Sequence, residues 1–428
     1  MSLAHNASQL FQGFSKLDRE ARFQRLLALG AITPEDVIFL RQGAVKDMSL
    51  ADKLIENVIG YFQLPLGVAT NFRIDGHDYV IPLAVEETSI IAALSKTAKW
   101  IRQHGEITTH VTGHCIIGQI QLAKITDFKR FSKIFEANKQ VFIEKANEDV
   151  AQNMVKRGGG IIDIQLRRLP RADGADMAVI HLMMDSCDAM GANIINQVLE
   201  YLKGPIESLT GEQVSMCILS NLNDQKLTTA KVTIHEVEKS LGERLQEASI
   251  FAETDPYRAA THNKGVMNGV DPVVIATGND WRAVEAGVHA YAARSGIYQA
   301  ITRWRYQDGT LTGELTAPII VGTVGGVTSV HPTANLCLRM MGIESANHLS
   351  RIIAAVGLVQ NLGAIRALCT EGIIQGHMKL HIDNLLMVAG ATEGETPILK
   401  EQLQDWLMMN KRVSLNNAYE LLAEIRQA

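Results

Sequence analysis

Apolar and polar residues alternate, or recur at helical spacing, in six consecutive segments between residues 112 and 222. The pattern predicts the order strand, helix, strand, strand, helix, strand, which is that of the ferredoxin-like split βαβ arrangement. The predicted segments are a strand at 115–125, a helix at 127–157, strands at 161–169 and 177–185, a helix from about Ala192, and a strand at 213–222. We therefore expect a compact α+β domain over 112–222, inserted in a larger one.

The larger domain is expected in two parts, 1–111 and 223–375, and to be mostly helical. Polar capping residues predict helix starts near Asp18, Thr33 and Ser89. ENVIG at 56–60 lies in a helix-like stretch. Hairpin turns are predicted at Asp75-Gly76, between alternating residues, and at Asp308-Gly309.

The C-terminal part is helical from about Glu344, with a break framed by Gly372 and Gly376. Three short amphipathic segments follow at about 377–389, 396–409 and 414–427. So small a tail, 376–428, lacks the volume for much of a core, so it docks on the body or moves as a lid. The fold class is therefore α+β, with an inserted domain and a helical C-terminal flap.

Composition narrows the function classes. The chain of 428 residues is 46% hydrophobic and 20% charged, as in a globular protein, and its net charge of −5 offers no basic excess for general nucleic-acid binding. We find no stretch of signal-peptide or membrane-spanning character, so we expect a cytoplasmic protein without a membrane partner. The five cysteines are scattered and never in C-x-x-C spacing, which supports neither a disulfide framework nor a zinc site.

The most unusual segment is DPYRAATHNKGVMNGVDPVVIATGNDWRAVE, at 255–285. It places Lys264 among Asn263, Gly265 and Asn268, with almost no apolar periodicity. A solvated lysine needs neither glycine nor amide neighbours, so a reaction centre is one interpretation. An ordered loop with a surface lysine is the other.

A second candidate is DAMGAN at 188–193, which follows a predicted strand and opens a helix. Free backbone N–H groups at a helix N-terminus stabilise phosphate oxygens, so this turn is a candidate nucleotide loop. A plain strand-to-helix turn capped by Asp188 is the alternative. The chain has no G-x-G-x-x-G here, so a nucleotide would be held on something other than a Rossmann unit.

Two further segments carry ionisable groups. Glu86 and Glu87 stand at a helix entry, where favourable helix-dipole placement explains at least one of them. His377 is either an ordinary helix-start histidine or a proton donor on a mobile element. His381 completes a His-x-x-x-His pair, but we recognise no third ligand and expect no metal.

With these segments together, the chain closely resembles 3-hydroxy-3-methylglutaryl-CoA (HMG-CoA) reductases of the bacterial, class II type. The resemblance runs from about Leu50 to the C-terminal helices, in six blocks: ENVIG at 56–60, VEE-x-SI at 85–90, DAMGAN at 188–193, DPYRAATHNKG at 255–265, GNDWRAVEAG at 278–287 and GHM at 376–378. It implies interconversion of HMG-CoA with mevalonate and CoA through mevaldehyde, by two hydride transfers with NADH or NADPH. A CoA-thioester acyltransferase and a non-catalytic CoA- or nucleotide-binding protein are the alternatives.

The resemblance implies roles for four catalytic residues. Lys264 would stabilise the oxyanion that hydride attack creates, and Asp280 would hold Lys264 in place and favour its charged form. Glu87 would exchange the proton that accompanies carbonyl reduction. His377 would protonate the departing CoA thiolate from the flap.

Ligand contacts are implied in the same way. The nicotinamide dinucleotide would contact Asp188, Met190, Gly191, Asn193 and Asn221. The substrate would contact Ser89, Arg258, Asn268, Gln360 and Asn361. The family also implies a homodimer with active sites at the subunit interface near ENVIG, and often a larger assembly of dimers such as a hexamer.

The choice between NADH and NADPH stays open. Ala151 stands where NADH-preferring relatives carry an acidic residue, so repulsion of a 2′-phosphate is lost there. Glu148, Asp149, Lys156 and Arg157 lie close enough to change that conclusion. The physiological direction of the reaction is likewise open.

Overall fold

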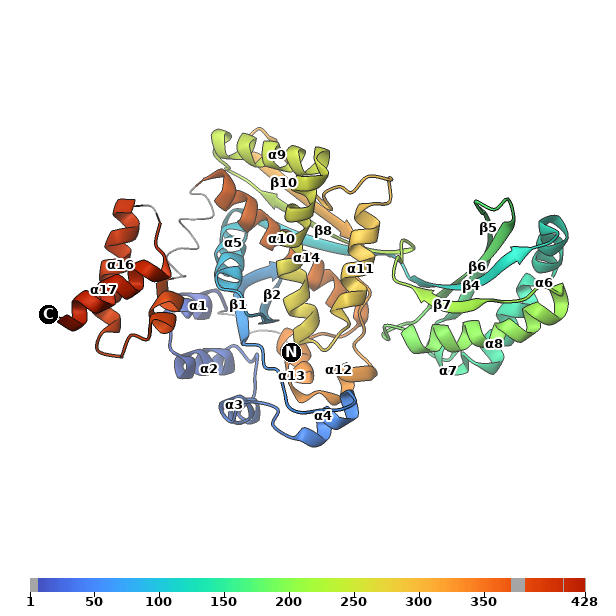
Figure 1. The fold of residues 1–428 in the computed structure, drawn as a ribbon, viewed down its shortest axis with the longest axis horizontal. Coiled ribbons are helices and arrows are strands. Elements are labelled where there is room, and N and C mark those ends of the chain that lie inside the picture. The colour runs from blue at the N-terminus through green and yellow to red at the C-terminus, as the bar shows by residue number, and fades with distance from the viewer. Residues whose placement is uncertain (1–6, 371–381, 411, 428) are drawn as a thin grey trace.

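The computed structural model describes residues 7–370, 382–410 and 412–427, and its strands form two separate sheets (Figure 1). The larger sheet has the order β2-β1-β3-β8-β10-β9. Its strands are β1 (Leu66–Ile74), β2 (His77–Ala84), β3 (Gly105–Gly113), β8 (Lys226–Ile234), β9 (Thr302–Gln307) and β10 (Thr310–Ala317). The larger part of the chain is therefore built on a six-stranded sheet and is less purely helical than predicted.

Both predicted hairpins of this sheet are confirmed. Asp75 and Gly76 turn between β1 and β2 with φ of 50° and 80°, and Asp308 and Gly309 turn between β9 and β10 with φ of 48° and 81°. Two successive positive φ angles twist a two-residue turn in the sense that antiparallel strands require. Asp-Gly supplies that conformation at little cost.

Helices of the larger part pack on this sheet and around one central helix (Figure 1). They are α5 (Ile90–His104), α9 (Lys239–Thr254), α10 (Pro256–Ala276), α11 (Trp281–Ala292), α12 (Gly326–Val330), α13 (Pro332–Met341) and α14 (Ala346–Cys369). The central helix is α14, which contacts α5, α9, α10, β3, β8 and β10. It is long and apolar enough to cross a membrane, but two thirds of its most apolar stretch is buried within the protein, as in a core helix.

Glycines let α10 and α14 approach closely. A Cβ on Gly269 of α10 would lie 2.9 Å from the carbonyl oxygen of Val356, and one on Gly357 of α14 would lie 2.8 Å from Cγ2 of Val270. Real Cβ atoms do not come so close to their neighbours, so the crossing depends on both glycines. This contact fixes α10 against the core.

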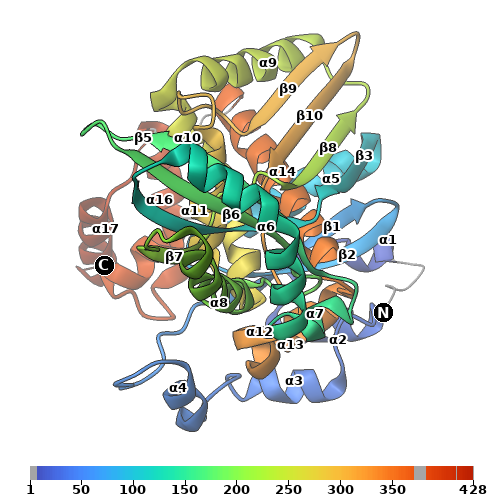
Figure 2. The ribbon, with the colours of Figure 1, turned by 90° about the vertical axis from the view of Figure 1, so that its right-hand side faces the viewer.

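The second sheet belongs to the middle of the chain, which projects from the body at the right of Figure 1 and faces the viewer in Figure 2. Its order is β5-β6-β4-β7, and all three pairings are antiparallel. The elements are β4 (Cys115–Ile125), α6 (Phe128–Asp149), α7 (Gln152–Val155), β5 (Gly160–Pro170), β6 (Asp176–Asp185), α8 (Ala192–Thr210) and β7 (Met216–Ser220). Apart from α7, they follow the predicted order of strands and helices. Their buried residues form a core separate from that of the larger sheet.

The N-terminal helices are α1 (Ala7–Phe11), the 3-10 turn η1 (Phe14–Lys16), α2 (Arg19–Ala28), α3 (Pro34–Arg41) and α4 (Met48–Leu54). Asp18 caps α2, and Thr33 with Asp36 forms a capping box on α3, as the sequence predicts. Near the C-terminus, helical residues 382–389, α16 (Thr396–Asn410) and α17 (Leu415–Gln427) share a small core of their own, at the left of Figure 1.

Three local predictions are wrong. The helix expected over 127–157 ends at Asp149 and restarts as α7, because Val150 and Ala151 interrupt it and Gly158 follows with φ of 93°. ENVIG at 56–60 is not helical, since α4 ends at Leu54. The segment with Lys264 is no loop but the 21-residue helix α10. Its buried face includes the polar residues His262 and Asn263, so its apolar residues do not recur at a clear helical spacing.

Candidate functional site

The structure brings Lys264 and Glu87 into contact. Nζ of Lys264 lies 3.4 Å from Oε2 of Glu87, and the two side chains are 63% and 40% exposed. Glu87 lies between β2 and α5, and Lys264 lies in the middle of α10. An exposed ion pair of this kind contributes at most about 1 kcal/mol to stability. Both groups therefore stay accessible to a ligand.

Buried polar residues hold the backbone beside Lys264. Nε2 of His262 lies 2.5 Å from the hydroxyl of Thr302, and the amide of Asn263 donates to the carbonyl oxygen of Gln299 at 2.9 Å. His262 is 2% exposed, and burial lowers its pKa to about 4, so its ring is neutral at neutral pH. These contacts fix the position of Lys264 along α10.

The predicted substrate contacts on α10 and near α5 lie around this ion pair. Asn268 is partly exposed one turn after Lys264, and Ser89 follows Glu87 by two residues with φ of 72°. Arg258 is partly exposed in the first turn of α10, and burial lowers the pKa of its guanidinium. A partly desolvated guanidinium interacts strongly with an anion that reaches it.

The two predicted contacts on α14 are buried. The carbonyl oxygen of the Asn361 side chain accepts from Thr302 and from the indole of Trp304, at 3.0 and 2.8 Å, and its amide lies 3.1 Å from Nε2 of His262. Among the described residues, Oε1 of Gln360 is buried and has no hydrogen-bond partner. Asn361 thus belongs to the network behind Lys264, while Gln360 keeps an acceptor for a ligand or water.

The predicted nucleotide loop joins the middle part of the chain to the larger one. Gly191 begins α8 with φ of 90°, and a Cβ there would come within 2.5 Å of Ile116 and 2.7 Å of Ser186. Oδ1 of Asp188 accepts from the backbone N–H of Ala346 at 2.9 Å, so this carboxylate also caps α14. Met190 and Asn221 line a small cavity of about 20 Å³ against Ala283 of α11.

Asp280 lies at this same place rather than beside Lys264. It is the N-cap of α11, where its Oδ1 accepts from the N–H of Ala283 at 3.1 Å and lies 3.5 Å from Nε of Arg282. From Lys264 to the end of α10 at Ala276 is 12 residues, or about 18 Å at the rise of an α-helix. The expected contact between Asp280 and Lys264 is therefore not formed within one chain, because Lys264 lies in the middle of α10 and Asp280 lies beyond its C-terminal end.

The predicted residues thus fall into two groups. The first group is Glu87, Ser89, Lys264 and Asn268, and the second is Asp188, Met190, Gly191, Asn193, Asn221 and Asp280. Helix α10 separates the groups. His377 and His381 lie outside the described residues.

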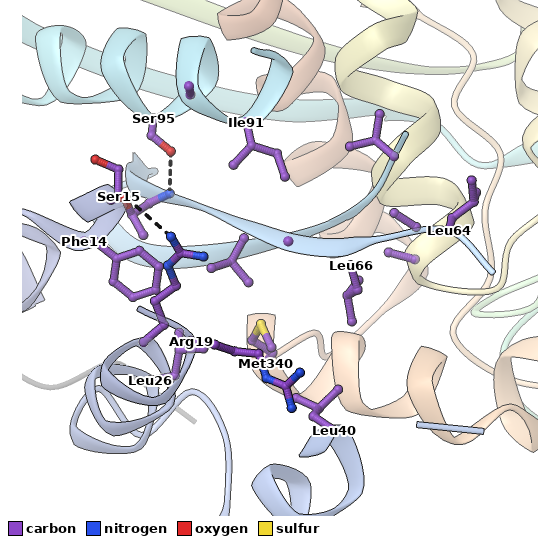
Figure 3. A pocket seen from close by; sticks show the side chains of 18 of the residues that line it. Phe14, Ser15, Arg19, Leu26, Leu40, Leu64, Leu66, Ile91, Ser95 and Met340 are labelled. Atoms are coloured by element: carbon purple, nitrogen blue, oxygen red, sulfur yellow. Dashed lines mark hydrogen bonds between the residues drawn. The ribbon is translucent and has the colours of Figure 1, made fainter. Parts of the chain in front are cut away.

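Two residues of the first group, Glu87 and Ser89, line a large cavity of about 1530 Å³, part of which is drawn in Figure 3. They line it together with five basic residues, Arg19, Arg22, Lys96, Lys99 and Arg102. Phe14, Leu26, Leu66 and Met340 supply an apolar side. The basic lining was not identified from the sequence. Its one visible signal is the spacing of Lys96 and Lys99, which places both lysines on neighbouring positions of one helix face.

The cysteines do not resemble nucleophiles. Burial raises the pKa of all five thiols, at positions 115, 187, 217, 337 and 369, and that of Cys337 to about 12. A thiol attacks as the thiolate, so a raised pKa makes each unreactive at neutral pH. This argues against the acyltransferase alternative in its cysteine-dependent form.

Comparison with known proteins gives one consistent result. Residues 21–382 match the family model for hydroxymethylglutaryl-coenzyme A reductase. Over 425 residues the chain is 42% identical to the 3-hydroxy-3-methylglutaryl-coenzyme A reductase of Archaeoglobus fulgidus, which covers 98% of this chain and 95% of that protein. It is 32% identical to a probable reductase of the same name from Borreliella burgdorferi, over 87% of this chain and 86% of that protein.

Solved structures agree. The 3-hydroxy-3-methylglutaryl-coenzyme A reductase of Streptococcus pneumoniae superposes with a TM-score of 0.82 at 37% identity, over 97% of this chain and 99% of that one. A structure of the class II enzyme of that organism, bound to NADPH in open conformations, gives a TM-score of 0.81 at 37% identity, over 84% of this chain and 100% of that one.

Proposed function

Because the chain belongs to the hydroxymethylglutaryl-coenzyme A reductase family, and to its class II type, we propose that it reduces HMG-CoA to mevalonate and free CoA. The thioester takes up two hydrides and two protons, with mevaldehyde between the two reductions. The observation that carries this proposal is the contact of Lys264 with Glu87, which lines a cavity large enough for a CoA thioester.

The two residues divide the chemistry. The ammonium group of Lys264 stabilises negative charge on the substrate oxygen as the carbonyl carbon is reduced. Glu87, within reach of Lys264, carries the proton that this oxygen takes up. His377 is assigned the protonation of the CoA thiolate on the basis of the family motif alone.

The nucleotide loop fits a nicotinamide dinucleotide. Gly191 has room for no side chain and begins α8, where free N–H groups and the helix dipole favour a phosphate. Asp188, Met190, Asn193 and Asn221 are the proposed contacts around it. When bound, the reduced nicotinamide supplies the hydride.

We further propose that NADPH is accepted. Ala151 is uncharged and buried at the start of α7, so it does not repel a 2′-phosphate, and the Asp149 carboxylate is engaged by the Tyr201 hydroxyl. The positive charge of Arg157 acts on Cys187, next to the nucleotide loop. We expect Arg157→Ala to raise the KM for NADPH about tenfold, the loss of one charge-assisted hydrogen bond, and to leave that for NADH nearly unchanged. Equal changes for both cofactors would contradict this role.

The large cavity is the proposed CoA site. Its lysines and arginines suit the phosphates of CoA, and its apolar side suits the aliphatic part of the pantetheine. The chain is proposed to be organised as an inserted ferredoxin-like nucleotide-binding domain at 112–222, a substrate-binding domain at 1–111 and 223–375, and a flap at 376–428.

A complete site is proposed to form between two copies of the chain. One copy supplies Glu87 and Lys264, and the other supplies Asp280 and the nucleotide loop, since about 18 Å of α10 separates the two groups within a chain. Exposed apolar side chains offer surface for such pairing: Ile59 and Phe62 around ENVIG are 102% and 94% exposed, and Tyr257 on α10 is 88% exposed.

Mixing of inactive variants tests the shared site. Lys264→Ala and Asp280→Ala chains, refolded together, should regain about a quarter of wild-type activity, because half of randomly paired dimers are mixed and each mixed dimer has one intact site. Lys264→Ala with Glu87→Ala is the matched control, and it should regain nothing, because those residues come from one chain. No recovery in either mixture would show that Asp280 acts with the Lys264 of its own chain.

The overall function is tested with purified protein by following oxidation of the nicotinamide by its ultraviolet absorbance. HMG-CoA is offered with NADH and with NADPH, and mevalonate plus CoA with each oxidised cofactor. Turnover of HMG-CoA with release of free thiol supports the proposal and decides the feasible direction. An enzyme that is folded but inactive in all four assays would refute it.

A further inference from the structure

Two carboxyl groups meet midway between the two groups of site residues. Asp271 lies on α10, two turns beyond Lys264, and Glu285 lies on α11, just over one turn beyond Asp280. The side chain of Asp271 interacts with that of Glu285, and Oδ1 of Asp271 is buried without a hydrogen-bond partner among the described residues. Two carboxyl groups can hydrogen-bond only when one of them is protonated.

The described residues around the pair supply no cation to replace that proton. Burial and then the contact with Glu285 raise the pKa of Asp271 to about 8, and Glu285 is the one charged group of the described chain that acts on it. On the other faces of α10, Val266, Met267, Val270, Val273 and Val274 pack into the apolar core formed with β2 and α14.

Other titratable groups lie near the edges of the pair. On α11, His289 lies one turn beyond Glu285, and its Nδ1 is 2.7 Å from the hydroxyl of Tyr298. Burial raises the pKa of Tyr298, and the charge of Glu285 contributes. Lys264 is about 10 Å away along α10. None of these described groups is placed as a counter-ion to Asp271, whereas a shared proton would pair the two carboxyl groups.

We propose that Asp271 and Glu285 share one proton and act as a positioning pair, holding α11, and with it Asp280, in register with the helix that carries Lys264. This role rests on the proposed function. The spacing matters because a site formed from two copies requires Lys264 of one copy to meet Asp280 of the other. If α11 shifts along α10, both sites of the dimer lose alignment together.

The shared proton is tested by unfolding at different pH values. A folded-state pKa raised above the unfolded value stabilises the protein at low pH, and that stabilisation is lost as pH rises towards the folded pKa. Between pH 6.5 and 8 we expect the unfolding constant of the wild type to rise about tenfold per pH unit, because unfolding then releases one proton. Asp271→Asn should remove this dependence, since an amide donor cannot ionise. Glu247→Gln, an exposed carboxylate-to-amide change on α9, should keep it.

The positioning role is tested by kinetics. Asp271→Leu, which cannot hydrogen-bond, should lower kcat at pH 7 about tenfold with KM for HMG-CoA within about twofold, since it misaligns catalytic groups without removing a binding contact. Asp271→Asn should restore kcat to within about twofold of the wild type. It should also keep activity above pH 8 better than the wild type does.

Each outcome decides a separate point. An unchanged pH dependence of unfolding in Asp271→Asn would refute the shared proton. A normal kcat in folded Asp271→Leu would reduce the pair to a folding element and overturn the positioning role. A wild type that does not turn over HMG-CoA would refute the proposed function and the positioning role with it, while the unfolding data would still decide the shared proton.

Discussion

The outer and inner faces of α10 differ in almost every physical respect. The outer face carries Tyr257, Lys264 and Asn268, which are exposed or partly exposed. The inner face carries His262 and Asn263, buried and hydrogen-bonded to other elements. The exposed ion pair of Lys264 contributes little to stability, whereas its buried neighbours hold α10 in place.

The difference shows how an exposed reactive group acquires a fixed position. A lysine side chain has several rotatable bonds, and an exposed ion pair holds it weakly. The helix backbone beside it is held instead by buried hydrogen bonds. His262 contacts Thr302 and Asn361, and Asn263 donates to Gln299. Activity and stability should therefore separate cleanly between the two faces.

The largest separation is expected for Lys264→Ala. Loss of the ammonium group that stabilises the oxyanion should lower kcat about 10³-fold, while the melting temperature stays within a degree or two of the wild type. Steady-state assays and thermal unfolding measure the two effects. Lys239→Ala, an exposed lysine on α9, is the matched control and should keep full activity. A folded Lys264→Ala enzyme with near-normal turnover would remove this residue from the mechanism.

His262→Ala should show the opposite profile. It leaves the Thr302 hydroxyl and the Asn361 amide without their buried partner, which should cost about 3 kcal/mol in the free energy of unfolding. The loss in kcat should be smaller than for Lys264→Ala, because the ammonium group remains. Denaturant titration and kinetics check this ordering, and a stable but inactive variant would contradict it.

Two glycines of α10, one turn apart, allow a closely packed position to be compared with an open one. A Cβ on Gly269, on the inner face, would come within 2.8 Å of the Gln360 Cβ, so Gly269→Ala should lower the free energy of unfolding by about 1–3 kcal/mol. A Cβ on Gly265 would meet nothing within 4 Å, so Gly265→Ala should raise it by up to about 1 kcal/mol through helix propensity. Changes of equal sign would show that the two positions are packed alike.

The smallest effect is expected for acid titration of the wild type. As the pH is lowered from about 6.5 to about 4, the lowered pKa of His262 makes the stability decrease, because only the unfolded state takes up that proton. The raised pKa of Asp271 makes the stability increase over the same interval. Each residue changes the number of protons bound on unfolding by about one, with opposite sign, so the contributions of His262 and Asp271 should nearly cancel. Relative to the wild type, stability should increase on acidification in His262→Gln and decrease in Asp271→Asn, by about 3 kcal/mol at most in each case. Parallel slopes in both variants would be incompatible with these pKa shifts.

Several features of this arrangement could be predicted from the sequence because they are local. The Asp75-Gly76 and Asp308-Gly309 turns require positive φ angles that these dipeptides adopt easily, and the start of α8 follows from Gly191 and Ala192. Three strands of the middle part, β4, β5 and β6, alternate over enough residues to define their ends within one residue, whereas the strand predicted at 213–222 covers only Met216–Ser220. Such signals need no knowledge of distant contacts.

The rest depends on contacts far apart in the chain. Helix α10 escaped detection because its inner face contains His262 and Asn263, whose burial is compensated by Thr302, Asn361 and Gln299 from other segments. The separation of Lys264 from Asp280 was also hidden, since family motifs name residues without saying whether they act within one chain. The basic lining of the cavity combines α2 and α5, which no local pattern connects.

Helix α14 has a consequence for how the protein is made. It is the most apolar helix of the described chain and sits among α5, α9, α10, β3, β8 and β10, and every one of these precedes it in the sequence. During synthesis the N-terminal parts leave the ribosome first. When Ala346–Cys369 emerges, its whole binding surface already exists, so the segment most prone to aggregate or to be mistaken for a membrane anchor can be covered as soon as it appears.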